Sequence, residues 1–86
     1  MQNAWIVYIL RCADDTLYTG ITDDIDRRIA LHNAGKGAKY TRGRGPVSIC
    51  YRETCQSKGE ALRREYEIKS LCREKKLALI KRCCLE

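Results

Sequence analysis

The first part of the chain contains two hydrophobic segments that are typical of β-strands. Residues 5–10 are nearly all β-branched, aromatic or aliphatic, without alternation of polar and apolar positions, which predicts a strand covered on both faces. Residues 13–16 supply turn chemistry, and residues 17–21 return to strand character. We therefore predict a β-hairpin whose first strand is central in its sheet.

The pattern then changes to a helix, a loop and a third strand. Acidic residues and a capping side chain at positions 22–24 precede apolar residues at helical spacing from Ile25 onward. Gly35 is expected to end this helix. A basic, glycine-rich loop covers residues 35–46, and residues 47–51 alternate like a strand.

Two further helices are predicted in the C-terminal part of the chain. Residues 57–60, Ser-Lys-Gly-Glu, match a capping box, and helix-forming residues follow from Ala61 to Leu71. A last helix, from about residue 73 to residue 83, has apolar and basic residues on opposite sides. The apolar stripes expected to face the core are Ala61, Leu62, Tyr66, Ile68 and Leu71 in the first helix and Leu77, Ile80 and Cys84 in the second.

The predicted order of elements is strand, strand, helix, strand, helix, helix. This order is typical of an α+β domain in which a three-stranded, mainly antiparallel sheet is flanked by helices. With 86 residues the chain has room for one core, so we expect a single domain over residues 1–86. A domain this small buries only about 60% of its unfolded surface, which makes a surface cleft the expected form of a functional site.

The charge of the chain favours a polyanionic partner. Lys and Arg outnumber Asp and Glu by 17 to 11, which gives a formal net charge of +6. Nucleic acid is the first candidate, and a basic charge that only maintains solubility explains these numbers equally well. No apolar run approaches membrane-spanning length or forms a signal-peptide core, so we expect a cytoplasmic protein without membrane contact.

The six cysteines match neither a metal site nor a disulfide framework. They include no C-x-x-C pair, and the single histidine, His32, is distant from all of them in the sequence. Reduced and mostly buried thiols are therefore expected.

The length of the hairpin loop decides which side chains share a face of the sheet. A two-residue loop would leave Tyr8 and Tyr18 on opposite faces. A three-residue loop at residues 13–15 pairs Tyr8 with Gly20 and puts both rings on one face, but it needs Asp15 or a neighbour near the left-handed region. With that loop, Gly20 is expected to leave the Tyr8 ring uncovered and reachable.

Several motifs together carry a resemblance to a known family. They are Val7-Tyr8-Ile9 followed by Tyr18-Thr19-Gly20, the stretch from Asp26-Arg27-Arg28 to His32, the run from Gly35 to Thr41, and Glu65 in a later helix. On these residues the span from Trp5 to about Ile80 resembles the GIY-YIG nuclease superfamily, and within it the small single-domain bacterial YhbQ-like (UPF0213) branch. The chain has Ile-Val-Tyr where that family has Gly-Ile-Tyr, and Tyr-Thr-Gly where it has Tyr-Ile-Gly, so both tyrosines and the second glycine are kept.

The resemblance implies metal-assisted cleavage of a phosphodiester bond by Tyr8, Tyr18, Arg28, His32 and Glu65. Glu65 would hold one divalent cation, Mg²⁺ or Mn²⁺. Tyr8 would help to activate water, and Arg28 would neutralise the phosphate. Tyr18 would position the scissile group, and His32 would support Tyr8 or contact the phosphate.

The residue types agree with these roles on chemical grounds. One carboxylate, with water and phosphate completing the shell, is a common way of holding Mg²⁺. A guanidinium can bind a phosphate bidentately, and Arg28 and His32 are four apart, so one helix face presents both. A tyrosine with a pKa of about 10 is a poor base at neutral pH, so we expect nearby cations to lower the pKa of Tyr8.

Each of these residues also has an ordinary structural interpretation. Tyrosine is common on strands, and Arg28 alone would be a solvated helix charge. Glu65 could merely pair with Lys69 at i,i+4, and His32 could cap a helix end. Only the ordered set favours a catalytic site.

The basic loop is a second candidate for nucleic-acid contact. Its glycines let backbone amides approach phosphates, its cations favour counterion release, and its aromatic ring could stack on a base. A flexible solvated loop is the alternative. The contact residues predicted here are Lys36, Lys39, Tyr40, Arg42 and Arg44.

The sequence thus predicts a metal-dependent endonuclease that cleaves DNA rather than RNA, acting on branched, damaged or single-stranded forms as in DNA repair. The alternative is a non-catalytic nucleic-acid-binding module on the same scaffold. Small size favours the module, because related nucleases often carry an extra domain for target choice. Retention of all five site residues favours the enzyme.

Overall fold

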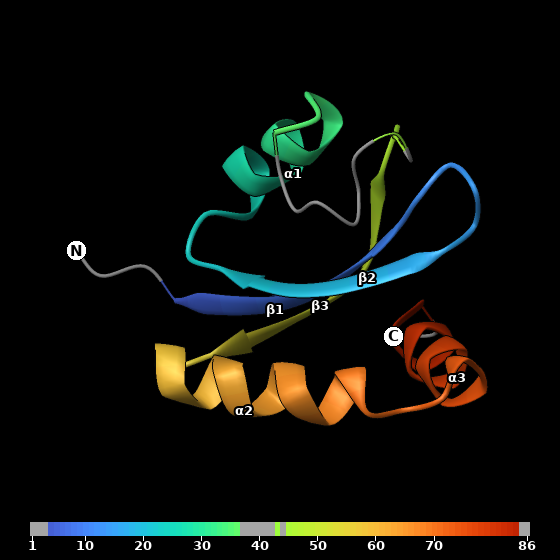
Figure 1. Ribbon diagram of the computed structural model, residues 1–86. Coiled ribbons are helices and arrows are strands. Elements are labelled where there is room, and N and C mark those ends of the chain that lie inside the picture. Colours follow the sequence, from blue (N-terminus) through green and yellow to red (C-terminus); the bar gives the residue numbers. More distant parts are fainter. Residues whose placement is uncertain (1–3, 37–42, 44, 85–86) are drawn as a thin grey trace.

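The chain folds into a three-stranded antiparallel sheet with helices on both faces. The structure is a computed structural model that describes residues 4–36, 43 and 45–84, with side chains up to residue 82. In chain order the elements are β1 (Trp5–Arg11), β2 (Leu17–Thr22), α1 (Ile25–Asn33), β3 (Ser48–Cys55), α2 (Lys58–Lys69) and α3 (Arg73–Cys84) (Figure 1). The strand order is β2-β1-β3, with both pairs antiparallel, so the predicted α+β fold and the central position of the first strand are confirmed.

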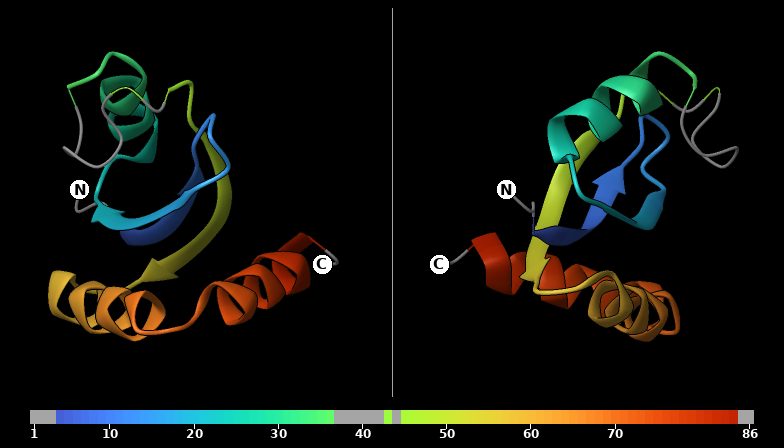
Figure 2. Two further views of the ribbon diagram at one scale, coloured as in Figure 1. Left: turned by 45° about the vertical axis from the view of Figure 1, so that its right-hand side comes forward. Right: turned by 90° about the vertical axis from the view of Figure 1, so that its left-hand side faces the viewer.

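The sheet separates two hydrophobic clusters. Helix α1 covers one face, while α2 and α3 cover the other (Figure 2). Along β1 the side chains alternate between the two: Val7 and Ile9 pack in the cluster that includes α2 and α3, and Tyr8 and Leu10 pack in the cluster beneath α1. Because β1 is covered on both faces, it has no polar side, and its sequence is a nearly continuous run of apolar residues.

The hairpin has the three-residue loop. Tyr8 pairs with Gly20, and the Cys12 amide donates to the Thr16 carbonyl at 2.9 Å, which closes the loop around residues 13–15. Asp15 has a φ of 68°, the left-handed conformation that this loop requires and that Asp tolerates better than most residues. The alternative two-residue loop is therefore wrong.

The later elements differ from the sequence prediction mainly at their ends. Strand β3 continues to Cys55, beyond the predicted end at residue 51, because it stays paired with β1 until Trp5 lies opposite Cys55. Helix α2 begins where the capping box predicts, since the Ser57 hydroxyl accepts the Glu60 amide at 3.1 Å. It ends at Lys69, two residues before the predicted Leu71.

The apolar stripe predicted for α2 is only partly correct. Ala61 and Ile68 are fully buried against the sheet, but Leu62 is 46% exposed and Tyr66 is 76% exposed. At roughly 100° per residue, Leu62 and Tyr66 lie about 100° and 140° around the helix from Ala61, too far to face the sheet. In α3, Ile80 is buried and Leu77 packs against the same cluster, as predicted.

The described cysteines are free thiols of mixed exposure. Cys12 and Cys55 are buried, Cys50 is half-buried and Cys72 is exposed. The predicted reduced thiols are thus present, although one of these four faces solvent. Among the described residues, no helix is long and apolar enough to cross a membrane.

Candidate functional site

Three aromatic side chains from three different elements meet on the α1 face of the sheet. The ring centroids of Tyr8 and Tyr18 are 6.4 Å apart, those of Tyr8 and His32 6.2 Å, and those of Tyr18 and His32 5.3 Å. The Tyr8 hydroxyl lies 3.3 Å from Nε2 of His32, within hydrogen-bonding distance. The structure therefore brings three of the predicted site residues into direct contact.

The local sequence explains why these side chains converge. The hairpin register puts both tyrosines on one face, and helix α1 lies over that face because its two ends are fixed. At its start Asp24 caps the helix by accepting the Arg27 amide at 3.2 Å, and just beyond its end Gly35 has a φ of 76°. The Asn33 side chain accepts the Val47 amide at 2.6 Å, which ties α1 to the start of β3.

Gly20 makes room for the Tyr8 ring. A Cβ atom added at Gly20 would lie 2.7 Å from the Tyr8 hydroxyl oxygen and 2.9 Å from Cζ of the ring. The ring thus lies across the backbone of β2, and Tyr8 is 0% exposed. The expectation that Gly20 leaves Tyr8 uncovered is wrong, because the ring itself fills the space and α1 closes over it.

Burial controls the protonation of the aromatic cluster. Burial raises the pKa of the Tyr8 hydroxyl, and the neighbouring Arg28 guanidinium opposes this shift without reversing it. Burial also lowers the pKa of His32, and the positive charge of Arg28 lowers it further. The expectation that cations lower the pKa of Tyr8 is thus wrong for the protein alone: the phenol stays protonated and the imidazole stays neutral at pH 7.

Arg28 lies beside this pair and is the predicted site residue that reaches solvent through a pocket. The Tyr8 hydroxyl is the main cause of the raised pKa of Arg28, so the guanidinium stays charged. Its Nε atom is buried and has no hydrogen-bond partner among the described residues. A buried donor without a partner is costly, which marks Arg28 as a group prepared for an acceptor such as a phosphate oxygen.

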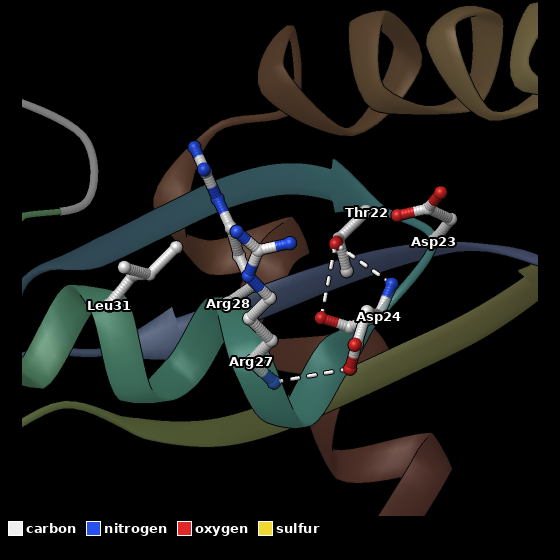
Figure 3. Close-up of a pocket in the computed structure, with 6 residues that line it drawn as sticks. All are labelled: Thr22, Asp23, Asp24, Arg27, Arg28 and Leu31. Atoms are coloured by element: carbon white, nitrogen blue, oxygen red, sulfur yellow. Dashed lines mark hydrogen bonds between the residues drawn. The ribbon is translucent and has the colours of Figure 1, made fainter.

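The pocket next to Arg28 has a volume of about 240 Å³. Figure 3 shows Arg27 and Arg28 extending from α1 on the side that faces the end of β2. Sequence reasoning missed Arg27 as a member of the site, although the adjacent Arg27-Arg28 pair was visible. The lining residues are Thr22, Asp23, Asp24, Arg27, Arg28 and Leu31.

Glu65 comes from α2, which covers the face of the sheet opposite to α1 (Figure 2). Its charge still contributes to raising the pKa of Tyr8, so its carboxylate lies within electrostatic reach of that hydroxyl. The Glu65 side chain is 19% exposed and pairs with Lys69 at 3.5 Å, which is the structural role considered for it. Within the described part of the chain, no three His, Cys, Asp or Glu side chains gather into a metal-binding group.

The predicted contacts in the basic loop fall largely outside the described residues. Lys36 directly follows the end of α1 and is exposed. The other members of the set, Lys39, Tyr40, Arg42 and Arg44, lie outside the described part of the chain.

Comparison with known proteins assigns the chain to a family. The model of the GIY-YIG catalytic domain matches residues 4–78. The chain belongs to the GIY-YIG family. It therefore has a nuclease-type domain, and Tyr8 and Tyr18 stand in the two motifs that give the family its name.

Close relatives of the chain carry the UPF0213 name. A UPF0213 protein of Desulfotalea psychrophila is 58% identical over 93% of this chain and 74% of its own length. A UPF0213 protein of Staphylococcus haemolyticus is 58% identical over 86% of this chain and 90% of its own length. The predicted membership of the UPF0213 branch is thus confirmed.

Two solved structures share the fold. The solution NMR structure of a UPF0213 protein from Bacillus halodurans is 54% identical, with a TM-score of 0.59 over 91% of this chain and 83% of that one. A solution NMR structure of a protein from E. faecalis is 37% identical, with a TM-score of 0.65 over 100% of this chain and 94% of that one.

Proposed function

We propose that this GIY-YIG domain is an endonuclease that hydrolyses phosphodiester bonds in DNA with one divalent cation, Mg²⁺ or Mn²⁺. The observation that carries the proposal is the position of Arg28, whose buried Nε has no hydrogen-bond partner among the described residues and whose guanidinium lies beside the Tyr8–His32 pair. A phosphate that enters the pocket and binds Arg28 would lie beside the Tyr8–His32 pair. We retain DNA rather than RNA as the substrate.

The residues fit a single, largely hydrated cation. Glu65 offers one half-buried carboxylate near Tyr8, which is the hard oxygen donor that Mg²⁺ and Mn²⁺ prefer. Lys69 would leave Glu65 when a cation binds. A cation held there would supply Lewis-acid charge to the phosphate.

The chain supplies the proton transfer. Because the pKa of His32 is lowered, its imidazole is neutral at pH 7 and can accept a proton, and its Nε2 is 3.3 Å from the Tyr8 hydroxyl. Tyr8 can therefore take a proton from the attacking water while passing its own proton to His32. This relay lets a phenol with a raised pKa act as a base without first becoming a free phenolate.

Arg28 and Tyr18 act on the phosphate. The guanidinium neutralises the charge that accumulates on the phosphoryl oxygens. When the guanidinium moves from Tyr8 to the phosphate, the buried hydroxyl of Tyr8 becomes exposed to water. Tyr18 is half-buried and lies against both other rings, and from this position its hydroxyl would orient the scissile group. The DNA on either side of the scissile phosphate would be held by the basic loop, through Lys36, Lys39, Tyr40, Arg42 and Arg44.

The experiment that tests this function is a nicking assay on supercoiled plasmid and single-stranded DNA with Mg²⁺, Mn²⁺ or EDTA. Nicking is expected with either metal, absent in EDTA, and lost in Glu65→Gln. The matched control is Glu60→Gln, which changes a carboxylate on the same helix to a residue that also suits the capping box. Nicking that survives in Glu65→Gln would remove that residue as the cation ligand.

A specific observation also favours a second function, that of a non-catalytic nucleic-acid-binding module. Tyr8 is fully buried and its pKa is raised, which suits a structural tyrosine. Salt-sensitive DNA binding without nicking in any metal would support this module and exclude the nuclease.

A further inference from the structure

Helix α2 presents two large apolar side chains to solvent. Leu62 and Tyr66 are four apart, and their exposed fractions of 46% and 76% make them the exposed large hydrophobic residues of the described chain. Residues four apart on a helix lie on the same face, so the two form one patch. Elsewhere on α2 the apolar residues Ala61 and Ile68 are fully buried, so this patch has no role in the core.

The patch lies on the flank of α2 that carries Glu65. Taking Ala61 as the reference, helical geometry puts Glu65 at about 40°, Leu62 at about 100° and Tyr66 at about 140°, all in the same direction around the axis. Arg64 lies in the opposite direction, at about −60°.

The contacts of Arg64 fix which edge of the sheet each flank faces. Its Nε atom bonds to Oε2 of Glu53 at 3.0 Å, so the Arg64 flank faces β3. Since β3 and β2 are the two edges of the sheet, the Glu65 flank faces β2, the strand that carries Tyr18. The exposed patch therefore continues outward from the proposed cation ligand.

The charges around the patch are suited to a nucleic-acid strand. Lys69 lies on the same flank, at about 80°, and its ammonium group is held by Glu65 at 3.5 Å. The Lys69 side chain is 52% exposed, so its ammonium group can exchange Glu65 for a backbone phosphate next to the Tyr66 ring. An exposed aromatic ring beside a lysine is the combination by which proteins hold single-stranded nucleic acids.

We propose that Tyr66, supported by Leu62, is a stacking platform for one unpaired base of the DNA strand that is cleaved. The inference rests on the proposed nuclease function and specifies its substrate class. A base inside a duplex has both faces covered by its neighbours, so the exposed ring can take only a base that is already unpaired. The substrate is therefore single-stranded DNA, or a branch or end with an unpaired nucleotide beside the scissile phosphate.

Binding measured in EDTA tests the platform separately from cleavage. We compare a fluorescein-labelled single-stranded oligonucleotide with a blunt duplex of the same sequence by fluorescence anisotropy, using the parent protein, Tyr66→Ala, Tyr66→Trp and Lys69→Gln. Tyr66→Ala is expected to weaken single-strand binding by about tenfold, with duplex binding unchanged, and Tyr66→Trp is expected to keep it. Lys69→Gln should reduce the salt dependence of single-strand binding, whereas Tyr66→Ala should leave that slope unchanged.

The outcomes separate this inference from the function on which it rests. The side chain of Tyr66 is largely in solvent, so Tyr66→Ala should unfold at the same denaturant concentration as the parent. If Tyr66→Ala binds single strands as tightly as the parent while the parent nicks DNA, the platform is wrong and the nuclease stands. If Tyr66→Ala loses as much affinity for the duplex as for the single strand, the platform is also wrong. A parent protein that binds no DNA would overturn both proposals.

Discussion

The ring of Tyr8 lies across the backbone of Gly20, so close that a single methyl group at Gly20 would come within 2.7 Å of the Tyr8 hydroxyl oxygen. Gly20 has an ordinary strand conformation, so the requirement for glycine here is steric and has no conformational cause. The second family motif thus shapes the position of the tyrosine in the first.

We therefore predict that Gly20→Ala destabilises the fold by about 1–3 kcal/mol and abolishes nicking, because the buried Tyr8 ring has no free space into which it can move. Urea unfolding measures the first effect. The control is Gly59→Ala in the first turn of α2, where an added Cβ meets nothing within 4 Å and alanine should stabilise the helix by about 0.5–1 kcal/mol. Equal stability of Gly20→Ala and the parent would contradict the close packing.

The neutral state of His32 predicts a pH-dependent stability. In the unfolded chain His32 gains a proton at its ordinary pKa of 6.5, whereas burial lowers that pKa in the folded protein. The unfolded state therefore binds more protons below about pH 6.5, and the free energy of unfolding should fall as the pH drops from 6.5 toward the lowered pKa.

Urea unfolding at pH 7.5, 6.5 and 5.5 measures this decline. His32→Gln lacks the titrating ring and should lose less stability over the same range, even if it starts from a lower value. Parallel pH profiles for the parent and His32→Gln would show that His32 is not held neutral by the fold.

Thr19 lies next to the site, and we expect its substitution by valine to stabilise the fold. Its hydroxyl oxygen is buried without a hydrogen-bond partner among the described residues, on the face of β2 opposite to Tyr18. Valine has the same shape without the hydroxyl, so Thr19→Val should raise the free energy of unfolding by about 1 kcal/mol. Thermal and urea unfolding test this, and nicking should be unchanged because the side chain points away from the aromatic cluster. Loss of stability would mean that the hydroxyl has a partner.

From the hydrogen bond between Arg64 and Glu53 we infer that Arg64 positions Glu65. Glu53 accepts hydrogen bonds from both Arg64 and the Tyr51 hydroxyl, and this pairing fixes the rotation of α2 that directs Glu65 toward β2. In Arg64→Met we expect the Mg²⁺ concentration for half-maximal nicking to rise by about tenfold, with the rate at saturating Mg²⁺ largely retained. Arg63→Met, which changes the adjacent exposed arginine, is the matched control. A lower rate at saturating Mg²⁺ with an unchanged metal requirement would argue against positioning.

The fold could be predicted from the sequence because local signals agreed with the final packing. The unbroken apolar run at β1, the capping residues Asp24 and Ser57, and the left-handed Asp15 are each determined by neighbouring residues. The end of β3 could not be predicted, because residues 52–55 pair with β1 only through a long-range register. Local patterns carry no information about that register.

The meeting of three side chains at the candidate site was predictable, but the membership of Arg27 and the electrostatics of the site were not. Tyr8, Tyr18 and His32 meet as the hairpin register and helical spacing require. The pKa of Tyr8 depends on how completely α1 covers the ring, which no local pattern reveals. The exposure of Tyr66 was missed because every apolar residue of α2 was assigned to the core, whereas a stripe of two buried residues is sufficient there.

The central claim, that Arg28 binds the scissile phosphate beside the Tyr8–His32 pair, is tested most directly by one rate comparison. The initial rate of plasmid nicking in saturating Mg²⁺ is measured for the parent, Arg28→Lys and Arg63→Lys, the last of which changes an exposed arginine of α2. The parent should nick, Arg28→Lys should be slower by about 10–100-fold because lysine cannot replace the bidentate guanidinium, and Arg63→Lys should stay within about threefold. A parent that does not nick, or an Arg28→Lys variant as fast as the parent, would contradict the claim.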